Sequence, residues 1–248
     1  MKKAATIDTS ATVRDIVVQD YRTADVFKKY GINYCCGGNL PLNEACSALN
    51  INIPELNKEL AKATSTVQLP SSLQFDDWSL DFLVDYIINV HHSYIKKVVP
   101  LLQGQIMSFV DGHKKKYPQL LKVQHTFEEL ASLLLEHIQK EEESIFPYLK
   151  QISSTHKRKE TYGSLFVRTL GKPLNQVLER EHLHIAALMK QLREITNHFQ
   201  FPEDACTNYQ VIFHKLKELD NDLVQHKHLE NNVLFPKALQ LEREILQH

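Results

Sequence analysis

The chain has 248 residues, of which 43% are apolar and 24% charged, and a formal net charge of −1 at pH 7. This balance is ordinary for a globular protein and excludes the basic excess of a general nucleic-acid binder. No apolar stretch reaches the ~18–20 residues of a membrane-spanning helix, and residues 1–15 hold no apolar signal core, so we expect no membrane partner and a cytoplasmic location. Four cysteines are too few for a disulfide framework, whereas thirteen histidines direct attention to metal chemistry.

Residues 1–63 are predicted to form a small N-terminal helical domain. Thr12 is a candidate N-cap of a first helix, and Gly31 ends a second. Two more helices follow, and the first of them begins at Pro41. Residues 64–76 are polar and contain a proline and several serines and threonines, a composition that predicts a linker.

The only glycine cluster in the chain, GINYCCGGN, follows the second of these helices and contains Cys35 and Cys36. Simple packing of the two thiols is one interpretation. The other is that the glycines leave the thiols accessible to a partner, because a glycine backbone permits close approach. Cys46 is expected to be buried in the third helix, and no function is assigned to Cys206.

Four later segments have apolar residues spaced three and four apart, which is the period of helices in a left-handed bundle. Their predicted bounds are 79–110, 118–149, 173–196 and 208–246. Four long amphipathic helices joined by loops are typical of an up-down-up-down bundle. The fold is therefore predicted to be all-α, with the bundle in residues 77–248 and the small helical domain before it.

Each of these helices has a histidine where its apolar seam continues, and two of them add a glutamate four residues later. A buried glutamate without a partner charge is costly, because the charge loses its water. No lysine or arginine occupies the adjoining seam positions, so we expect a cation from outside the chain. The six candidate metal ligands are His92, His137, Glu141, His182, His226 and Glu230.

These seam residues belong to an internal repeat. His137 and His226 each precede a glutamate by four positions and a Phe-Pro pair by nine and ten, in HIQKEEESIFP and HKHLENNVLFP. The repeat indicates a helical hairpin used twice, which would bring two His-His-Glu sets to one level of the core. Three further His-x-x-x-Glu pairs, beginning at His125, His156 and His214, lie off the seam and are interpreted as pairs on helix surfaces.

Four imidazoles and two carboxylates without cysteine predict a site for two metal ions, in which each glutamate serves both. A closed zinc site needs only four ligands, and magnesium or calcium prefers oxygen, so iron fits best, with manganese or a mixed pair as alternatives. Open positions would admit an oxo bridge, water, dioxygen or nitric oxide. Whether His91 or His184 joins the site is left open.

These motifs resemble a known family. The bundle is similar to hemerythrin, and the chain also resembles the iron–sulfur cluster repair proteins, called repair of iron centres, in FKKYGINYCCGGNLPLNEAC at 27–46, EREH at 179–182 and HLENNVLFP at 228–236. The resemblance covers nearly the whole chain. It implies an oxo-bridged di-iron centre on the six seam ligands, and a role for Cys35 and Cys36 in handling iron, sulfur or nitric oxide.

The function implied by this resemblance is repair of iron–sulfur clusters damaged by nitrosative or oxidative stress, through supply or exchange of iron. The partners would be damaged iron–sulfur proteins, with nitric oxide or dioxygen as small ligands. Two alternatives stand beside it: an enzyme that couples two nitric oxide molecules to nitrous oxide, and a sensor or store for oxygen or nitric oxide. The oligomeric state is open, with a homodimer among the alternatives.

Overall fold

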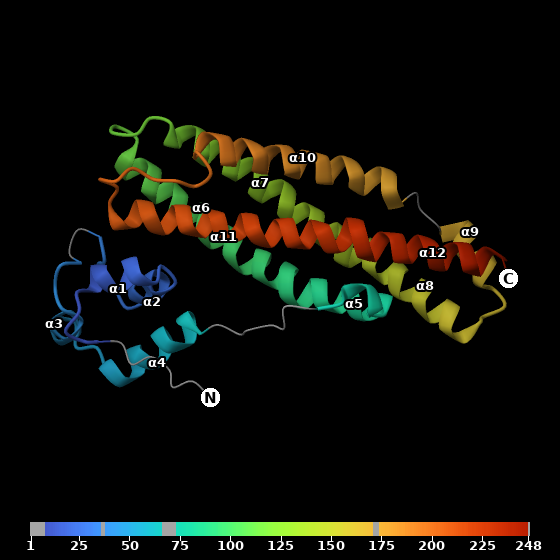
Figure 1. The fold of residues 1–248 in the computed structure, drawn as a ribbon, viewed down its shortest axis with the longest axis horizontal. Helices are drawn as coiled ribbons and strands as arrows, with labels where there is room; N and C mark the ends of the chain where they lie inside the picture. Colours follow the sequence, from blue (N-terminus) through green and yellow to red (C-terminus); the bar gives the residue numbers. More distant parts are fainter. Residues whose placement is uncertain (1–7, 36–37, 66–72, 171–173, 248) are drawn as a thin grey trace. The chain divides into compact units, whose positions relative to one another are not determined.

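The fold is known from a computed structural model, which describes residues 8–35, 38–65, 73–170 and 174–247. Helices make up the regular structure of this part of the chain, and no strand occurs in it (Figure 1). The β pairing described there is an isolated bridge between Thr12 and Pro41. The predicted all-α class is confirmed.

The chain divides into two compact units. One unit contains residues 1–71 together with 199–216, and the other contains residues 72–198 together with 217–248. The segment that enters α11, and the first turns of that helix, therefore belong with the N-terminal helices.

The N-terminal helices are short and begin and end at residues suited to those places. Thr12 is the N-cap of the first, where its side chain accepts a hydrogen bond from the Asp15 N–H, and Gly31 follows the second with a φ of 71° that favours glycine. Pro41 lies one residue before the third helix rather than inside it. The helices are α1 (Val13–Gln19), α2 (Thr23–Lys29), α3 (Leu42–Ala48) and α4 (Ile53–Thr64).

The core of this unit contains the side chains of Phe27, Leu42 and Leu56, each fully buried. Val211 from α11 packs in the same core and is 2% exposed. Burial of a valine side chain contributes on the order of 1.5–3 kcal/mol to folding, so residue 211 is a substantial part of this small core.

The second unit holds the long helices, which run in alternating directions from one to the next, as Figure 1 shows. The predicted up-down-up-down arrangement is confirmed. Three of the long helices consist of two α-helical parts joined by a π-helical turn. The elements are η1 (Phe75–Asp77), α5 (Leu80–Tyr86), η2 (Ile87–His92), α6 (Ser93–His113), α7 (Leu120–Lys140), η3 (Glu141–Ile145), α8 (Phe146–Arg158), α9 (Gly163–Leu170), α10 (Leu174–Ile195), α11 (Thr207–Leu229), η4 (Glu230–Leu234) and α12 (Phe235–Gln247).

Apolar side chains fill much of the core between the helices of this bundle. Leu83 of α5, Phe146 of α8 and Ala238 of α12 are among the buried residues of one cluster. Beyond the middle, α6 and α7 bury residues such as Val99 and Phe127. In the part of the chain that the structure describes, no helix has the length and apolar character to cross a membrane.

Candidate metal centre

Three π-helical turns position predicted ligands. The turn η2 ends at His92, η3 begins at Glu141, and η4 begins at Glu230. A π turn inserts one residue into an α-helix and redirects the side chains next to it, and such turns are frequent at functional sites. His182 is the exception, since it lies in the uninterrupted α10.

The two glutamate turns have a cause that can be read from the sequence. Each is followed by a Phe-Pro pair, which places Pro147 and Pro236 in the first turn of the next helical part. Proline has no N–H to donate, and its ring clashes with the carbonyl four residues earlier. A regular α-helix therefore cannot continue through the proline unchanged. The π turn directly before the proline accommodates the missing hydrogen bond and the steric clash. The Phe-Pro pairs thus mark where the glutamates turn inward.

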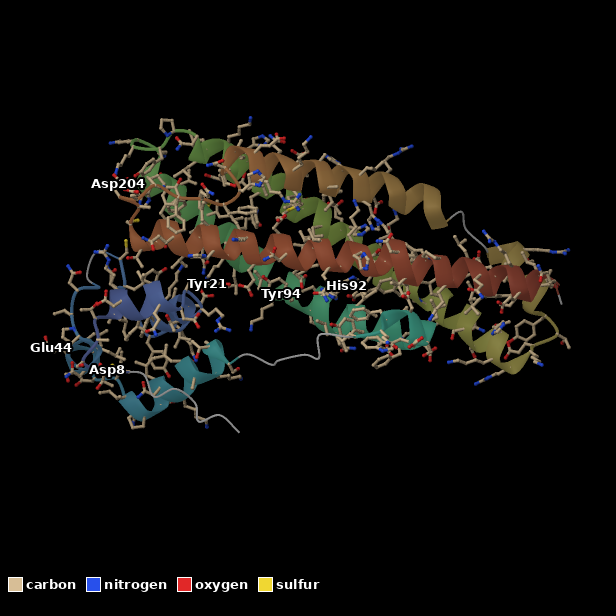
Figure 2. The ribbon with its side chains drawn as sticks, viewed as in Figure 1. Asp8, Tyr21, Glu44, His92, Tyr94 and Asp204 are labelled. Carbon is tan, nitrogen blue, oxygen red and sulfur yellow. The ribbon has the colours of Figure 1, made fainter. Side chains whose placement is uncertain are left out.

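The structure brings all six predicted ligands together in the core. They form two groups of four side chains, and all the potential ligand atoms within a group lie within 4.8 Å of one another. Glu141 and Glu230 belong to both groups, whereas each histidine belongs to one. The first group adds His92 and His226, and the second adds His137 and His182. The arrangement matches a pair of metal positions that share two carboxylates. Figure 2 labels His92 within the bundle.

The distances inside the cluster are short. The carboxylate of Glu141 lies 3.4 Å from His92 Nε2 and 3.3 Å from His137 Nε2. The carboxylate of Glu230 lies 2.7 Å from His226 Nε2 and 3.4 Å from His182 Nε2. All six residues are at most 6% exposed. The cluster is therefore removed from water, where an uncompensated charge is most costly.

Two observations indicate that these residues suit a cation. His137 and His182 use their Nδ1 atoms as donors, so in the neutral rings the Nε2 atoms carry lone pairs, yet these two atoms lie only 3.0 Å apart. Lone pairs at that distance repel unless a proton or a metal lies between them. In addition, neither carboxylate oxygen of Glu141 has a hydrogen-bond partner among the described residues, although both are buried. A bound cation would satisfy both groups of atoms.

Two carboxylates outside the cluster hold predicted ligand histidines in place. Glu142 accepts a hydrogen bond from His92 Nδ1 at 2.9 Å, and Glu181 accepts one from His137 Nδ1 at 2.9 Å. The other oxygen of each carboxylate lies 2.5 Å from a lysine, Lys96 for the first and Lys140 for the second. Such partners fix the ring orientation and the tautomer, and they raise the basicity of the metal-facing nitrogen.

Of the other two histidines in the cluster, His182 is supported by a neutral amide, and His226 is supported indirectly through a second histidine. His182 Nδ1 donates to Asn231 Oδ1 at 3.0 Å. His226 is stacked against His91, with ring centroids 5.5 Å apart, and His91 Nδ1 donates to Asp222 at 2.9 Å. His91 is 1% exposed and belongs to neither metal-ligand group, so the geometry gives it a supporting place beside His226.

These supporting residues were not among those predicted from the sequence. A signal was present for most of them, because Glu142 and Asn231 directly follow the two cluster glutamates and Glu181 directly precedes His182. Asp222 had no such signal, since its pairing with His91 depends on how α11 faces the π turn η2. His184 lies away from the cluster and pairs with Glu129 at 3.2 Å.

Charges within the cluster shift the proton affinities of its members. Burial acts to lower the pKa of His226, but the negative charges of Glu230 and Glu141 outweigh it and raise that pKa to about 9. Burial also opposes the charged form of His182, and the same two glutamates raise its pKa. For Glu141, burial acts to raise the pKa, and the neighbouring imidazoles of His182 and His92 bring it well below the usual range. Without a metal, His226 and His182 therefore favour their protonated forms beside the ionised carboxylate of Glu141, and a metal must compete with those protons.

The cysteines lie in the first unit. Cys35 is half-buried, its N–H donates to Asn33 Oδ1 at 3.0 Å, and Cys46 is buried on α3. Cys36 lies outside the described residues. The hydroxyl of Tyr34 donates to Asn208 Oδ1 at 3.2 Å, which joins the segment of Cys35 to the segment that follows Cys206.

The surroundings of Tyr34 disfavour the ionised form of its hydroxyl. Burial raises the pKa of its hydroxyl to about 12, with smaller contributions from Asp25, Cys35 and Cys206. Cys206 was assigned no function from the sequence, and its place close to Tyr34 was not predicted.

Two of the three off-seam histidine–glutamate pairs differ from their interpretation. His214 is half-buried, and its ring stacks on Tyr21 with centroids 5.1 Å apart, within the first unit. The sequence pattern assigned it to an exposed helix surface, because helical phase alone does not reveal that the N-terminal helices cover this stretch of α11. His156 pairs with Glu244 at 2.8 Å rather than with the glutamate four positions after it.

Comparison with known proteins gives two family matches. Residues 83–238 match the hemerythrin HHE cation binding domain, and residues 9–64 match a domain of unknown function, DUF542, named ScdA_N.

Curated relatives match over nearly the whole chain. An iron-sulfur cluster repair protein ScdA of Staphylococcus haemolyticus is 28% identical over 231 residues, which are 93% of this chain and 99% of the relative. An iron-sulfur cluster repair protein YtfE of Escherichia coli O8 (strain IAI1) is 32% identical over 222 residues, 88% of this chain and 91% of the relative. An ScdA of Staphylococcus epidermidis (strain RP62A) is 29% identical over 227 residues.

Proposed function

This chain belongs to the hemerythrin HHE cation-binding family and to the iron–sulfur cluster repair proteins, and on that premise we propose that it restores damaged clusters with iron held by its buried histidine–glutamate cluster. The proposed site consists of two iron ions on His92, His137, Glu141, His182, His226 and Glu230. When bound, the iron pair supplies exchangeable metal and redox chemistry.

The observation that carries the proposal is the sharing of Glu141 and Glu230 by both groups of ligand atoms. A single closed zinc site would use four ligands in a tetrahedron, and six nitrogen and oxygen ligands exceed that need. A set with four imidazoles and two carboxylates suits iron better than magnesium or calcium, which prefer oxygen alone.

The chain's own residues also favour a metal that can be exchanged. The raised pKa values of His226 and His182 mean that protons compete with the metal for two of the four imidazoles. Lys96 and Lys140 keep Glu142 and Glu181 oriented toward their histidines, so the site keeps its shape as metal binds and leaves.

We further propose that Cys35 and Cys36 take part in the exchange with the client protein. Thiolates are good ligands for iron, and the glycines after the pair permit close approach of a partner. The site for the client is thus assigned to the N-terminal helices, and the iron to the bundle.

Recovery of an iron–sulfur dehydratase that nitric oxide has inactivated tests the proposal. The iron-loaded full chain should restore its activity, and transfer of 57Fe from the chain to the dehydratase should accompany the recovery. The Glu141→Gln variant should lose both, whereas Glu143→Gln, an exposed change two residues away, should keep both. Stoichiometric nitrous oxide from the reduced chain and nitric oxide, without iron transfer, would instead favour nitric oxide reduction.

A further inference from the structure

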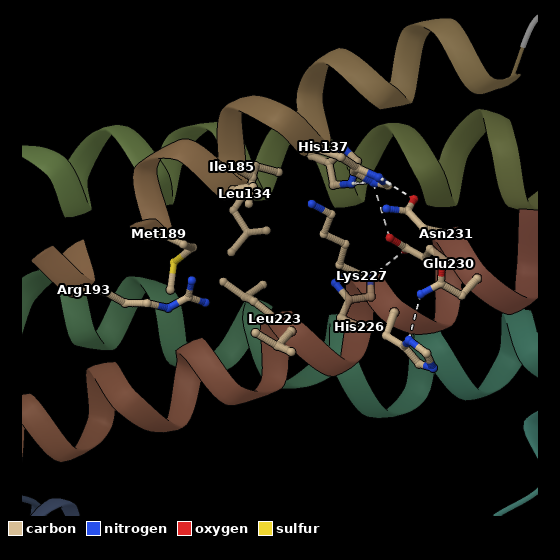
Figure 3. A pocket seen from close by; sticks show the side chains of 15 residues that line it. Leu134, His137, Ile185, Met189, Arg193, Leu223, His226, Lys227, Glu230 and Asn231 are labelled. Atoms are coloured by element: carbon tan, nitrogen blue, oxygen red, sulfur yellow. Dashed lines mark hydrogen bonds and ion pairs between the residues drawn. The ribbon is translucent and has the colours of Figure 1, made fainter. Parts of the chain in front are cut away.

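A cavity of about 450 Å³ lies between α7, α10 and α11 and reaches the metal-ligand cluster, since His137, His182, His226 and Glu230 line part of it (Figure 3). A single water needs only ~15 Å³, and pockets for small organic molecules begin near ~300 Å³. Dioxygen or nitric oxide alone would leave most of this space unfilled. The cavity therefore has the size of a site for an organic molecule.

One part of the cavity wall is apolar, and polar and charged side chains line the rest. Ile185, Met189 and Leu223 line the apolar part, together with Leu134 from α7. Figure 3 shows these side chains on one side of Lys227, with His137, Glu230 and Asn231 on the other. A molecule in this cavity would thus have an apolar part along α10 and a polar part toward the cluster.

Lys227 provides a positive charge at the middle of the cavity. Its side chain is half-buried and extends from α11 toward α10, as Figure 3 shows. Among the described residues, no carboxylate forms an ion pair with it. A charge that is partly removed from water and has no carboxylate partner in the described part of the chain can pair with a ligand.

The other charges around the cavity are already matched. Arg193 lies at the far end of the apolar wall, and Asp220 accepts two hydrogen bonds from its Nε at 2.9 and 3.0 Å. Glu230 is the one carboxylate among the described lining residues, and it contacts His226 and His182 within the cluster. Among the lining residues that the structure describes, Lys227 carries the charge that remains.

From this combination we infer that the cavity binds a small organic anion, a monocarboxylate with an apolar body. Its carboxylate pairs with the Lys227 ammonium, and its apolar body lies along Ile185, Met189 and Leu223. Such an anion occupies the space next to His137 and Glu230 and limits access to the cluster from this side. The inference goes beyond the proposed function, because the anion site is formed by the chain itself, whichever metal the cluster holds.

Hexanoate and the metal-free full chain provide a test that involves neither iron nor repair. The sequence contains three methionines, Met1, Met107 and Met189, so a sample labelled with 13C at the methionine methyl groups gives few signals. Met189 lines the cavity, whereas Met107 is 56% exposed on α6. Hexanoate should shift the Met189 signal with saturation and leave the Met107 signal in place.

Two lysine variants separate the charge from general effects. Lys227→Gln should weaken hexanoate binding about tenfold, since a hydrogen bond to a charged group is lost. Lys227→Arg should bind nearly as well as the parent. Lys217→Gln is the matched control, because Lys217 lies on the same helix and is exposed outside the cavity, and it should bind like the parent.

The inference is overturned if the Met189 signal does not respond to hexanoate, or if Lys227→Gln binds as tightly as the parent. 1-Hexanol, which has the same apolar body without the charge, should bind at least tenfold more weakly; equal binding would also overturn it. Because these readouts need no metal, they stay informative even if the chain proves to hold no iron.

Discussion

Glu142 and Asn231 occupy equivalent places in the two halves of the repeat, and each accepts a hydrogen bond from the Nδ1 atom of a ligand histidine on a neighbouring helix. The distances are 2.9 Å, from His92 to Glu142, and 3.0 Å, from His182 to Asn231. Each acceptor directly follows a cluster glutamate at the start of a π turn. The two halves thus use the same geometry with different charge. A carboxylate makes the imidazole more basic than an amide does, so the two histidines differ in donor strength.

Exchange of these two acceptors should change metal affinity in opposite directions. Glu142→Gln should weaken binding about tenfold, within the range of about 10–100-fold that such supporting partners contribute. Asn231→Asp should strengthen it, because a carboxylate then supports His182. Chelator competition measures both constants.

Asn232→Asp is the control for added charge. Asn232 is exposed and hydrogen-bonds to His228, so it adds the same charge without a bond to a ligand histidine. If Asn232→Asp strengthens binding as much as Asn231→Asp, long-range charge is responsible, and the hydrogen bond is not.

The seam pattern predicted which side chains gather in the core, because His92, His137 and the glutamates follow the same helical phase as the buried leucines. That these residues bind iron stays a prediction. Helical phase could not reveal the π turns, since a π turn changes the phase from which the prediction is made. Nor could it reveal partners such as Asp222, which depend on contacts between helices rather than on the period within one.

Removal of either shared glutamate should release both metal ions. Glu141 and Glu230 each belong to both ligand groups, so Glu141→Ala or Glu230→Ala removes a ligand from each position. His92→Ala and His182→Ala should each release one ion, since each histidine belongs to one group. Metal analysis after gel filtration gives the stoichiometry. Loss of a single ion in all four variants would contradict the sharing of carboxylates.

Removal of the metal should lower thermal stability. The cluster contains two glutamates that are at most 1% exposed, and a bound metal would balance their charge. A ligand present at about 1,000 times its Kd stabilises the folded state by about 4 kcal/mol, which corresponds to about 10 °C in Tm for a chain of this size. Calorimetry of the loaded and chelated full chain measures the difference. Equal Tm values would show that the metal does not bind in the folded core.

A chain reduced to residues 77–248 should keep its metal but lose stability. All six ligands lie in that range, so the metal content per chain should not change. The truncation removes the helices that bury Val211, which is 2% exposed, and it removes Asp25, the ion-pair partner of Lys215. We expect Tm to fall by about 5 °C. The truncation exposes Val211 to water. If this exposed valine makes the truncated chain aggregate, Val211→Ser should restore its solubility. Loss of metal on truncation would instead show that the N-terminal helices shape the site.

The double variant Cys35→Ser/Cys36→Ser should keep its metal and lose most of its repair activity. The metal-ligand cluster contains no cysteine, so two thiols in the other unit should not affect metal content. In the proposed exchange, however, a thiolate must receive iron or contact the nitrosylated client, and serine is a poor substitute as a ligand for iron. The measurement is recovery of a nitric-oxide-damaged dehydratase, with iron determined in the same samples.

Cys46→Ser is a less suitable control, because Cys46 on α3 is 1% exposed in the core and its replacement would disturb packing. Cys206→Ser is the more informative comparison, since Cys206 is half-buried and its segment is joined to Tyr34. If Cys206→Ser repairs normally and the double variant does not, the activity belongs to the Cys-Cys pair. If the double variant repairs as fast as the parent, the two cysteines serve packing, and the N-terminal helices must act through other residues.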